Sequence, residues 1–544
     1  MSPSGYINRE SVRCRIGEHC VRGTLAVTDS VYKSLATTML NKFLIWLFFA
    51  TLQLLSSSAF AEILEWEVGL STERSVIRAQ GTSAYTKTAP TILYIAGLDG
   101  QENFGRQFHD LLQAYSRIEE QERSINLITI PLANPDEEVL VFPPTGDAYA
   151  ENPTAHALWR WIGSHAPDLV IVAGGDRVEF SRALQSESVA GMGTISVRTF
   201  SSQMASTSYL QELQDTTPSQ ASLEVSQRLT RSPAELANQL AQIYGYDFST
   251  PAYVPGMSLI GRMRLGHMAD VESLLEDYLQ ISQINVANSS VMAGHLVFAE
   301  FAERTGNRAA LRHLVNAADL AFDEQGSMRE AMPMHSEMSD SFFMATPLLV
   351  KAGKLSRESR YFDMAARHVT YMRNMLLRDN GLYRHSPEAD VAWSRGNGFP
   401  ALGLALSLTD IPMTHPARDI LMGYFAKHLE SLRPHQDIDG MWHEVIDYPG
   451  SFAEITSTAM IGFAIKRGLD RGWLPQELYQ PLLDKAWDAV LIRTSKDGEF
   501  INACASTGKM PSLEAYLERP AIMGKDDRAG GMVMLFASEM AGVN

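Results

Sequence analysis

A group of polar and aromatic side chains in the second half of the chain combines residue types that transfer protons, bind anions and offer flat rings for stacking. A carboxyl group and an imidazole transfer protons, and a guanidinium pairs with a carboxylate. Indole rings offer flat apolar surfaces on which a sugar stacks. In chain order the candidates are Asp340, His385, Trp393, Arg395, Asn397, Trp442, His443 and Ser457. Together they predict a site for a sugar that carries a carboxylate.

Taken alone, these residues also have plain structural interpretations. Asp340 precedes an apolar stretch and suits the N-cap position of a helix. Trp442 suits an apolar core, and Arg395 suits a surface charge. Glu444 and Asp447, which follow Trp442, are expected to be solvated. Only the combination of residues therefore carries a functional prediction.

The second half of the chain also contains an internal repeat marked by glycine. Successive glycines lie 55, 59 and 58 residues apart, each shortly after an acidic residue: Gly326, Gly381, Gly440 and Gly498. A glycine there supplies the positive φ that ends a helix. About 57 residues hold two helices, so each repeat is predicted to be a helical hairpin. Residues 398–408 and 456–465 are almost entirely small or apolar, which favours the inner helices of a closed α/α toroid over an open solenoid.

The first half of the chain has a different periodicity. Residues 91–96, 125–130 and 169–173 are typical of buried strands, and 104–115 and 154–163 of helices. Strands and helices in alternation predict an α/β domain with a mostly parallel sheet covered by helices. The predicted organisation is an extension with a signal peptide over 1–61, the α/β domain over 62–202, a Ser-, Thr- and Gln-rich linker over 203–230, and a helical domain over 231–544.

The N-terminal segment has the three parts of a secretory signal peptide, at about residues 39–61. A charged start at Met39–Lys42 is followed by an apolar run over 43–55 and the sequence Ala59-Phe60-Ala61. The apolar run is shorter than the roughly 20 residues that span a membrane, although a membrane anchor is the alternative. We expect export to a periplasm or the outside, without stable membrane insertion after cleavage.

Composition excludes several function classes. The 544 residues carry a formal net charge of −17, which argues against a nucleic-acid partner. An acidic oligosaccharide partner must therefore be held by local Arg or Lys side chains. Only three cysteines occur, Cys14, Cys20 and Cys504, and the first two precede the signal peptide. This excludes a disulfide framework and a Cys-based zinc site in the mature protein.

Five motifs in the helical half resemble family 105 of the glycoside hydrolases, the unsaturated rhamnogalacturonyl hydrolases, and the related family 88, the unsaturated glucuronyl hydrolases. The resemblance covers about residues 250–540 in the family's order. The motifs are Ser339–Pro347, Gly381–His385, Trp393–Gly398, Glu454–Met460 and Asp526–Gly531.

The resemblance implies a six-hairpin (α/α)6 barrel that hydrates the double bond of a Δ4,5-unsaturated uronic acid without a metal or organic cofactor. Asp340 matches the family's catalytic Asp, and His385 matches its active-site His. The residues assigned to the substrate are Arg395 for its carboxylate, Trp393 and Trp442 for stacking, and Asn397, His443 and Ser457.

The chain departs from the family at one carboxylate. A second Asp is usual in a segment that here reads Ile284–Ser290 and holds none. An impaired, sugar-binding protein on the same fold is therefore the alternative function. A lyase is a third possibility, against which the Trp-x-Arg-Gly-Asn-Gly string argues.

The α/β half resembles the zinc carboxypeptidases around Gly97-Leu98-Asp99-Gly100-Gln101-Glu102. Asp99 stands where that family has a zinc-binding His, and the second His is replaced within Val172-Ala173-Gly174. Without two imidazoles a zinc site of that type is implausible. The resemblance implies a degenerate domain that serves docking or stability.

Overall fold

The computed structural model describes residues 62–84, 88–175 and 177–543. Residues Ala61–Asn544 form one compact unit. The predicted signal peptide lies outside the described residues. Within the described ranges no helix is both long and apolar enough to cross a membrane.

The first part of this unit is a six-stranded sheet of order β1-β2-β4-β3-β5-β6. The strands are β1 (Leu64–Leu70), β2 (Val76–Thr82), β3 (Thr91–Ile95), β4 (Asn126–Ile130), β5 (Leu169–Val172) and β6 (Ser196–Thr199). Strands β4, β3, β5 and β6 are parallel, whereas β1 pairs with β2 and β2 with β4 in the antiparallel sense. The sheet is therefore mixed. Most of its strand pairs are parallel, as predicted, but the antiparallel strands β1 and β2 were not predicted.

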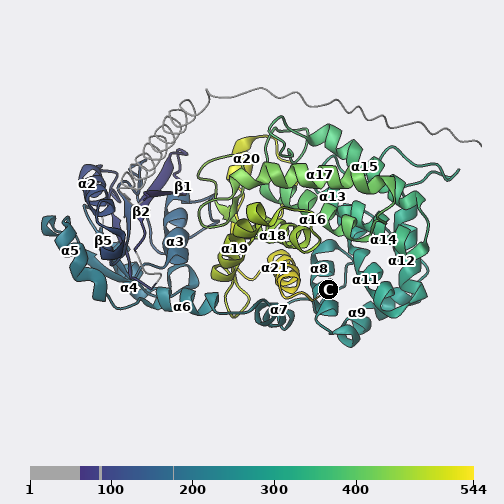
Figure 1. Cartoon of the computed structure of the whole chain (residues 1–544), viewed down its shortest axis with the longest axis horizontal. Coiled ribbons are helices and arrows are strands. Elements are labelled where there is room, and N and C mark those ends of the chain that lie inside the picture. The colour runs from purple at the N-terminus through teal and green to yellow at the C-terminus, as the bar shows by residue number, and fades with distance from the viewer. Residues whose placement is uncertain (1–61, 85–87, 176, 544) are drawn as a thin grey trace, which may run out of the picture. The chain divides into compact units, whose positions relative to one another are not determined.

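Helices cover both faces of this sheet (Figure 1). Helices α2 (Gly105–Ser116) and α5 (Thr207–Glu212) pack with the face that carries Ile92 and Tyr94. Helices α3 (Pro153–His165), α4 (Arg177–Ser186) and α6 (Gln220–Leu229) pack with the face that carries Leu93 and Ile95.

The segment 203–230 differs from the predicted linker. It forms α5 and α6 and places Leu210, Leu213 and Ala221 in the two cores of the sheet. Ser206 and Ser219 accept backbone N–H bonds at the starts of these helices, so the serines that suggested a linker are helix caps.

The second part is helical, as predicted, and its helices alternate between an outer and an inner layer (Figure 1). The outer helices are α7 (Pro233–Ala241), α9 (Met268–Gln280), α12 (Arg308–Asp319), α15 (Arg360–Leu376), α17 (Pro416–Leu432) and α19 (Gln476–Ile492). The inner helices are α8 (Tyr253–Arg264), α11 (Leu296–Thr305), α14 (Thr346–Ser356), α16 (Ser394–Asp410), α18 (Ile455–Asp470) and α21 (Asp527–Met540). Each inner helix packs against the next, and α21 packs against α8, which closes the ring.

Small residues allow the inner helices to approach closely. A Cβ on Gly403 of α16 would lie 2.4 Å from the carbonyl oxygen of Phe342, and one on Gly462 of α18 would lie 2.6 Å from the ring of Phe536. Helix α16 is buried on nearly every side, which explains its continuous apolar sequence. By contrast α15 buries one face.

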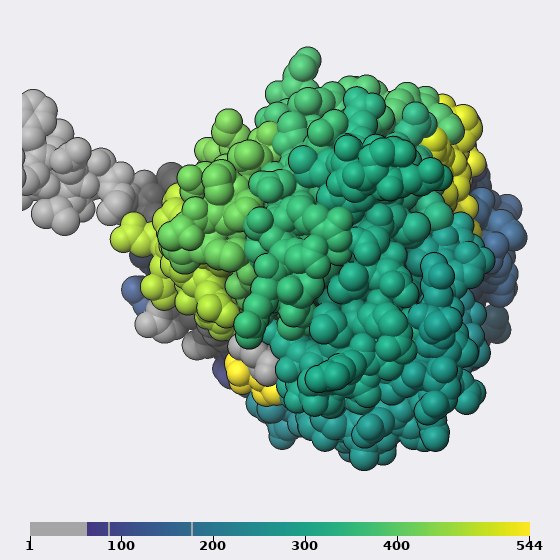
Figure 2. All heavy atoms as spheres, turned by 90° about the vertical axis from the view of Figure 1, so that its right-hand side faces the viewer, coloured from purple at the N-terminus to yellow at the C-terminus, as the bar shows by residue number. Residues whose placement is uncertain are grey.

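Teal and green atoms, from the middle of the chain, form the face that Figure 2 turns to the viewer.

The repeated glycines have positive φ angles of 79°, 84°, 93° and 74°. They lie beyond the helix ends, in tight turns where each glycine N–H donates to the carbonyl oxygen three residues earlier. Short β-bridges flank three of these turns. The glycines therefore close hairpins that carry the chain from an outer to an inner helix, and do not cap the helices as predicted.

Two of these glycines make a matched pair for a stability test. An added Cβ meets nothing within 4 Å at Gly326, but lies 2.3 Å from the Lys485 carbonyl oxygen at Gly440. We expect Gly326→Ala to lower the free energy of unfolding by about 1 kcal/mol, the cost of positive φ alone. Gly440→Ala should lower it by roughly 2 to 4 kcal/mol because backbone must also move. Urea unfolding of both variants measures the difference, and equal losses would contradict the packing argument.

Candidate active site

The N-terminal ends of the inner helices bring the polar residues of the motifs together on one side of the ring. Tyr253 begins α8, and its ring meets Phe343 and Phe399 edge-on. Burial raises the pKa of Tyr253, and the charges of Arg395 and Asp340 act on this pKa in opposite directions. The positive ends of the helix dipoles favour negative charge here.

Asp340 stands immediately before the short helix α13 (Ser341–Met344) and does not cap it. Its side chain is 12% exposed, and Oδ2 lies 3.1 Å from Nε2 of His385. The geometry does not make a hydrogen bond, so both atoms are buried without a partner among the described residues. A carboxyl oxygen beside an imidazole nitrogen is thus left free to exchange a proton with a ligand.

The other side of the His385 ring fixes its tautomer. Nδ1 lies 2.8 Å from the hydroxyl of Tyr516, which belongs to helix α20 (Leu513–Leu517). The Met510 backbone N–H donates to the same hydroxyl oxygen, so the hydroxyl hydrogen is available to Nδ1. A neutral His385 therefore carries its proton on Nε2, which faces Asp340.

Trp393 holds the His385 ring from the side. The two ring centroids are 4.3 Å apart, and the indole Nε1 donates to Oε1 of Glu444 over 2.8 Å. Trp393 is only 1% exposed, so its indole orients His385 and is not an open stacking surface.

Glu444 is fully buried, which corrects the expectation of a solvated side chain. Burial and the neighbouring charge of Glu454 raise its pKa to about 8. The Cys504 thiol, whose own pKa burial raises well above its usual value, donates to Oε1 over 3.0 Å. Glu444 is consequently a neutral acid at neutral pH. Asp447, expected to be solvated as well, is partly buried and pairs with Arg378 over 2.6 Å.

Arg395 is buried and is not a surface charge. Its Nη1 donates to the Thr456 hydroxyl and to the Cys504 carbonyl oxygen, and its Nη2 donates to the carbonyl oxygen of Ala505. Its guanidinium lies 4.6 Å from the centre of the Trp393 ring. The positive charge is thus held in place by neutral oxygens.

Several buried polar atoms in Ser339–Asp340, in His385 and in the residues next to or bonded to Trp393 make no hydrogen bond within the described residues. Buried polar groups are nearly always paired, so a cluster of unpaired ones marks a place for a ligand or ordered water. The atoms are Ser339 Oγ, Asp340 Oδ2, His385 Nε2, Ser394 Oγ and Glu444 Oε2.

Three of the predicted site residues make structural contacts instead. Asn397 bonds with its amide to the backbone of Tyr383 and Trp393, and Ser457 bonds with its hydroxyl to the Glu454 carbonyl oxygen. Trp442 is completely buried and donates to the carbonyl oxygen of Leu432, as its core interpretation expected.

His443 lies in a different place, a groove of about 470 Å³ that it shares with Trp66 of β1. Its Nε2 is 2.9 Å from Oδ2 of Asp437, and despite burial this carboxylate raises the pKa of His443. The structure therefore brings Asp340, His385, Trp393 and Arg395 together, and leaves His443 apart from them.

Sequence reasoning missed Tyr253, Tyr516 and Glu444 as members of the site. Their partners are distant in the chain, 131 residues for Tyr516 and 51 for Glu444. Arg528 was noted only within its motif. It pairs with Asp526 over 2.7 Å, has a 16% exposed side chain, and also acts on the Tyr253 hydroxyl.

The carboxypeptidase-like motif lies at the end of β3. The Asp99 carboxylate accepts the backbone N–H groups of Gly175 and Gln101 over 3.0 and 3.1 Å. It thus fixes the turns that follow β3 and β5, which suits a stabilising role.

A helical ring that holds a carboxylate, an imidazole and arginines at one end can transfer protons and bind an anion. A family model described as Glycosyl Hydrolase Family 88 matches residues 270–543, half of the chain. The chain belongs to this family.

The chain is also similar to several named proteins. The chain is 29% identical over 219 residues to an unsaturated rhamnogalacturonyl hydrolase of Bacillus subtilis, over 39% of this chain and 58% of that protein. It is 28% identical over 191 residues to an unsaturated 3S-rhamnoglycuronyl hydrolase of an Alteromonas species, over 35% and 40% of the two chains. The chain spans about half the length of the curated relatives it matches. A possible member of family GH105 from Salmonella enterica aligns with a TM-score of 0.49 at 21% identity, over 57% of this chain and 95% of that one.

The buried acid makes stability depend on pH. Glu444 ionises near 4.5 when unfolded and near 8 when folded, so the folded state binds more protons between these pH values. Stability must therefore fall as pH rises through this window, by about 1.4 kcal/mol per pH unit from this group. Glu444→Gln stays neutral and should lose that dependence. Urea midpoints at pH 5 and pH 8 measure it, and parallel losses in both proteins would show that Glu444 titrates normally.

Proposed function

We propose that this protein removes the Δ4,5-unsaturated uronic acid from the non-reducing end of oligosaccharides that lyases produce. The observation that carries the proposal is the buried contact of Asp340 with His385 among the N-terminal ends of the inner helices. The two facing atoms make no hydrogen bond within the described residues. Two relatives are named as unsaturated 3S-rhamnoglycuronyl hydrolases and one as an unsaturated rhamnogalacturonyl hydrolase, which supports this substrate class.

Asp340 acts as the general acid in this proposal. Its protonated carboxyl delivers a proton to C4 of the vinyl ether, and the cation develops at C5 and the ring oxygen. The resulting Asp340 carboxylate then takes a proton from a water that attacks C5, and the hydrated sugar rearranges and releases its aglycone. The His385 Nε2–H faces the carboxylate that forms and stabilises it.

Two arginines serve the substrate carboxylate in this proposal. Arg395 contributes a fixed positive charge and keeps Trp393 in place. Its guanidinium already makes three hydrogen bonds to neutral oxygens. Arg528 is more accessible, and its Nε is buried without a hydrogen-bond partner among the described residues. We therefore assign the direct contact to Arg528 and the supporting charge to Arg395. In this proposal the structural support for these groups comes from Trp393, Asn397, Trp442 and Ser457.

The alternative is a sugar-binding protein with impaired catalysis. It is favoured by the segment Ile284–Ser290, where a second carboxylate is absent and Asn288 instead caps helix α10 (Ser289–Gly294). In this case the site would bind the unsaturated sugar and leave its double bond intact.

Export and the α/β part complete the proposal. The signal-like segment at 39–61 would direct the protein to the periplasm or the outside. The α/β part would be a degenerate zinc-carboxypeptidase-like domain that supports the helical domain, with the boundary between them near residue 230.

Replacing the acid tests the chemistry. We expect Asp340→Asn to reduce the loss of ultraviolet absorbance from unsaturated uronates by about 10²- to 10⁴-fold, because the amide donates no proton to C4. Lyase digests of pectin, ulvan and glycosaminoglycans serve as substrates. Asp419→Asn, an exposed position on α17, is the control and should retain full activity. Binding without loss of absorbance by the parent protein would establish the alternative function.

Replacing Arg528 tests the recognition of the carboxylate. Loss of a charge-assisted hydrogen bond of about 1.5 to 3 kcal/mol should raise KM at least tenfold for Arg528→Gln. The change in kcat should be smaller, since the acid remains in place. An unchanged KM, measured on the digest that the parent protein accepts, would move the direct contact to Arg395.

A further inference from the structure

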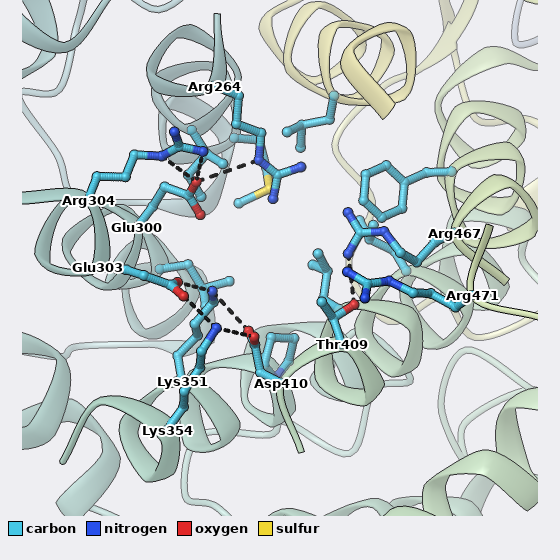
Figure 3. A pocket seen from close by; sticks show the side chains of 18 residues that line it. Arg264, Glu300, Glu303, Arg304, Lys351, Lys354, Thr409, Asp410, Arg467 and Arg471 are labelled. Atoms are coloured by element: carbon cyan, nitrogen blue, oxygen red, sulfur yellow. Dashed lines mark hydrogen bonds and ion pairs between the residues drawn. The ribbon is translucent and has the colours of Figure 1, made fainter. Parts of the chain in front are cut away.

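A second pocket lies at the opposite end of the ring, where the inner helices finish (Figure 3). Helix α16 begins beside Arg395 and ends at Asp410, which lines this pocket, so about 24 Å of helix separates the two places. The pocket has a volume of about 310 Å³. Its apolar lining includes Ile260, Leu296, Leu402, Leu406, Phe463 and Leu535.

Basic side chains dominate the rim of this pocket, but most are paired. Lys351 and Lys354 share Glu303 and Asp410, in a cluster of two cations and two anions. These lysines hold the pKa of Asp410 below its usual value despite burial, so the cluster is fully charged and neutral overall.

The other carboxylates at the rim are also paired with arginines. Arg304 pairs with Glu300 over 2.8 Å, and Arg467 donates to both carboxylate oxygens of Glu539. Arg264 shares Glu300 with Arg304, and Arg471 has no counter-charge among the described residues. In a chain with a formal net charge of −17, this is a local excess of positive charge.

Arg264 has unpaired donors. Its side chain is 10% exposed, and its Nε comes no closer than 3.7 Å to Glu300. Nε and Nη1 are both buried and donate to no atom of the described residues. Figure 3 shows its guanidinium directed into the pocket. A buried guanidinium without an acceptor is costly, so this one is matched to an acceptor from outside.

Arg471 lies on the other side of the pocket in Figure 3. It is exposed and makes no side-chain hydrogen bond or ion pair with the part of the chain that the structure describes. Cations also stabilise the C-terminal ends of helices, which accounts for basic residues in the last turns. That effect explains neither the unpaired donors of Arg264 nor the open apolar lining beneath them.

We infer that this pocket binds a small organic monocarboxylate. The carboxylate lies between Arg264 and Arg471, and a short aliphatic body packs on the apolar lining near Leu402 and Phe463. A pocket of about this volume suits a ligand of roughly ten non-hydrogen atoms. This binding is independent of the chemistry at Asp340.

Calorimetric titration of the full chain with hexanoate tests the inference. We expect saturable binding of one hexanoate, with no comparable binding of 1-hexanol, which lacks the charge, or of inorganic phosphate, which lacks the apolar body. Binding of either at the strength of hexanoate, or no binding of hexanoate, would overturn the inference.

Variants locate the binding. Arg264→Gln and Arg471→Gln should each weaken hexanoate binding about tenfold, the equivalent of one charge-assisted contact. Arg471 is exposed, so Arg471→Gln tests the inference even if Arg264→Gln unfolds. Arg367→Gln, at an exposed position on α15, is the matched control and should bind normally. Unchanged binding by Arg471→Gln would refute the assigned site. Asp340→Asn should still bind hexanoate, which separates this result from the proposed function.

Discussion

The candidate site depends on one buried carboxylate, that of Glu454. It accepts the backbone N–H groups of Thr456 and Ser457 and the Thr456 hydroxyl, and so caps helix α18. It also accepts the backbone N–H of Cys504 at the end of β9 (Phe500–Cys504) over 3.0 Å.

Through these two partners Glu454 controls residues that it does not touch. Arg395 donates to the Thr456 hydroxyl and to the Cys504 carbonyl oxygen, so two of its three acceptors belong to residues that Glu454 holds. Arg395 in turn lies over Trp393, which orients His385. One helix cap thus sets the positions of a guanidinium, an indole and an imidazole.

The α/β part reaches the same strand from the other side. Arg160 of α3 donates to the side chain of Asn502 over 2.7 Å and to the Ala521 carbonyl oxygen over 2.9 Å, and Tyr149 donates to Asn502 as well. Asn502 has a φ of 65°, an unfavourable conformation for a residue other than glycine. These contacts hold β9 in the path that brings Cys504 to Glu454. The α/β part therefore contributes to the position of the site residues.

Sequence patterns predicted those features that depend on short-range periodicity. The inner helices at 398–408 and 456–465 were recognisable because both sides of each helix are buried and their residues are small or apolar. The turn glycines were recognisable because their spacing follows the hairpin length. Strands β1 and β2 were missed, since they are an antiparallel addition to a parallel pattern.

The charge states of the site depend on contacts that no local pattern reveals. Glu444 reads as a solvated residue in its own segment, and only Trp393 and Cys504, 51 and 60 residues away, show that it is enclosed. Asp340 likewise matched a helix cap in sequence, whereas its side chain makes no capping bond. Motif resemblance found Asp340 but not Glu444, and three-dimensional packing determines what each of them can do.

Proton retention by Glu444 has a consequence for an acidic substrate. The N-terminal ends of the inner helices attract negative charge, but Asp340, Glu454 and Asp526 already stand among them. Arg395 and Arg528 offset part of this charge. An ionised Glu444 would add a negative charge next to Glu454 in a buried place, where Coulomb repulsion is strong. Because Glu444 keeps its proton at neutral pH, it does not reduce the positive potential of the arginines and helix ends, which favours the uronate of the proposed substrate. The raised pKa of a residue outside the proposed reaction would thus help to admit that substrate.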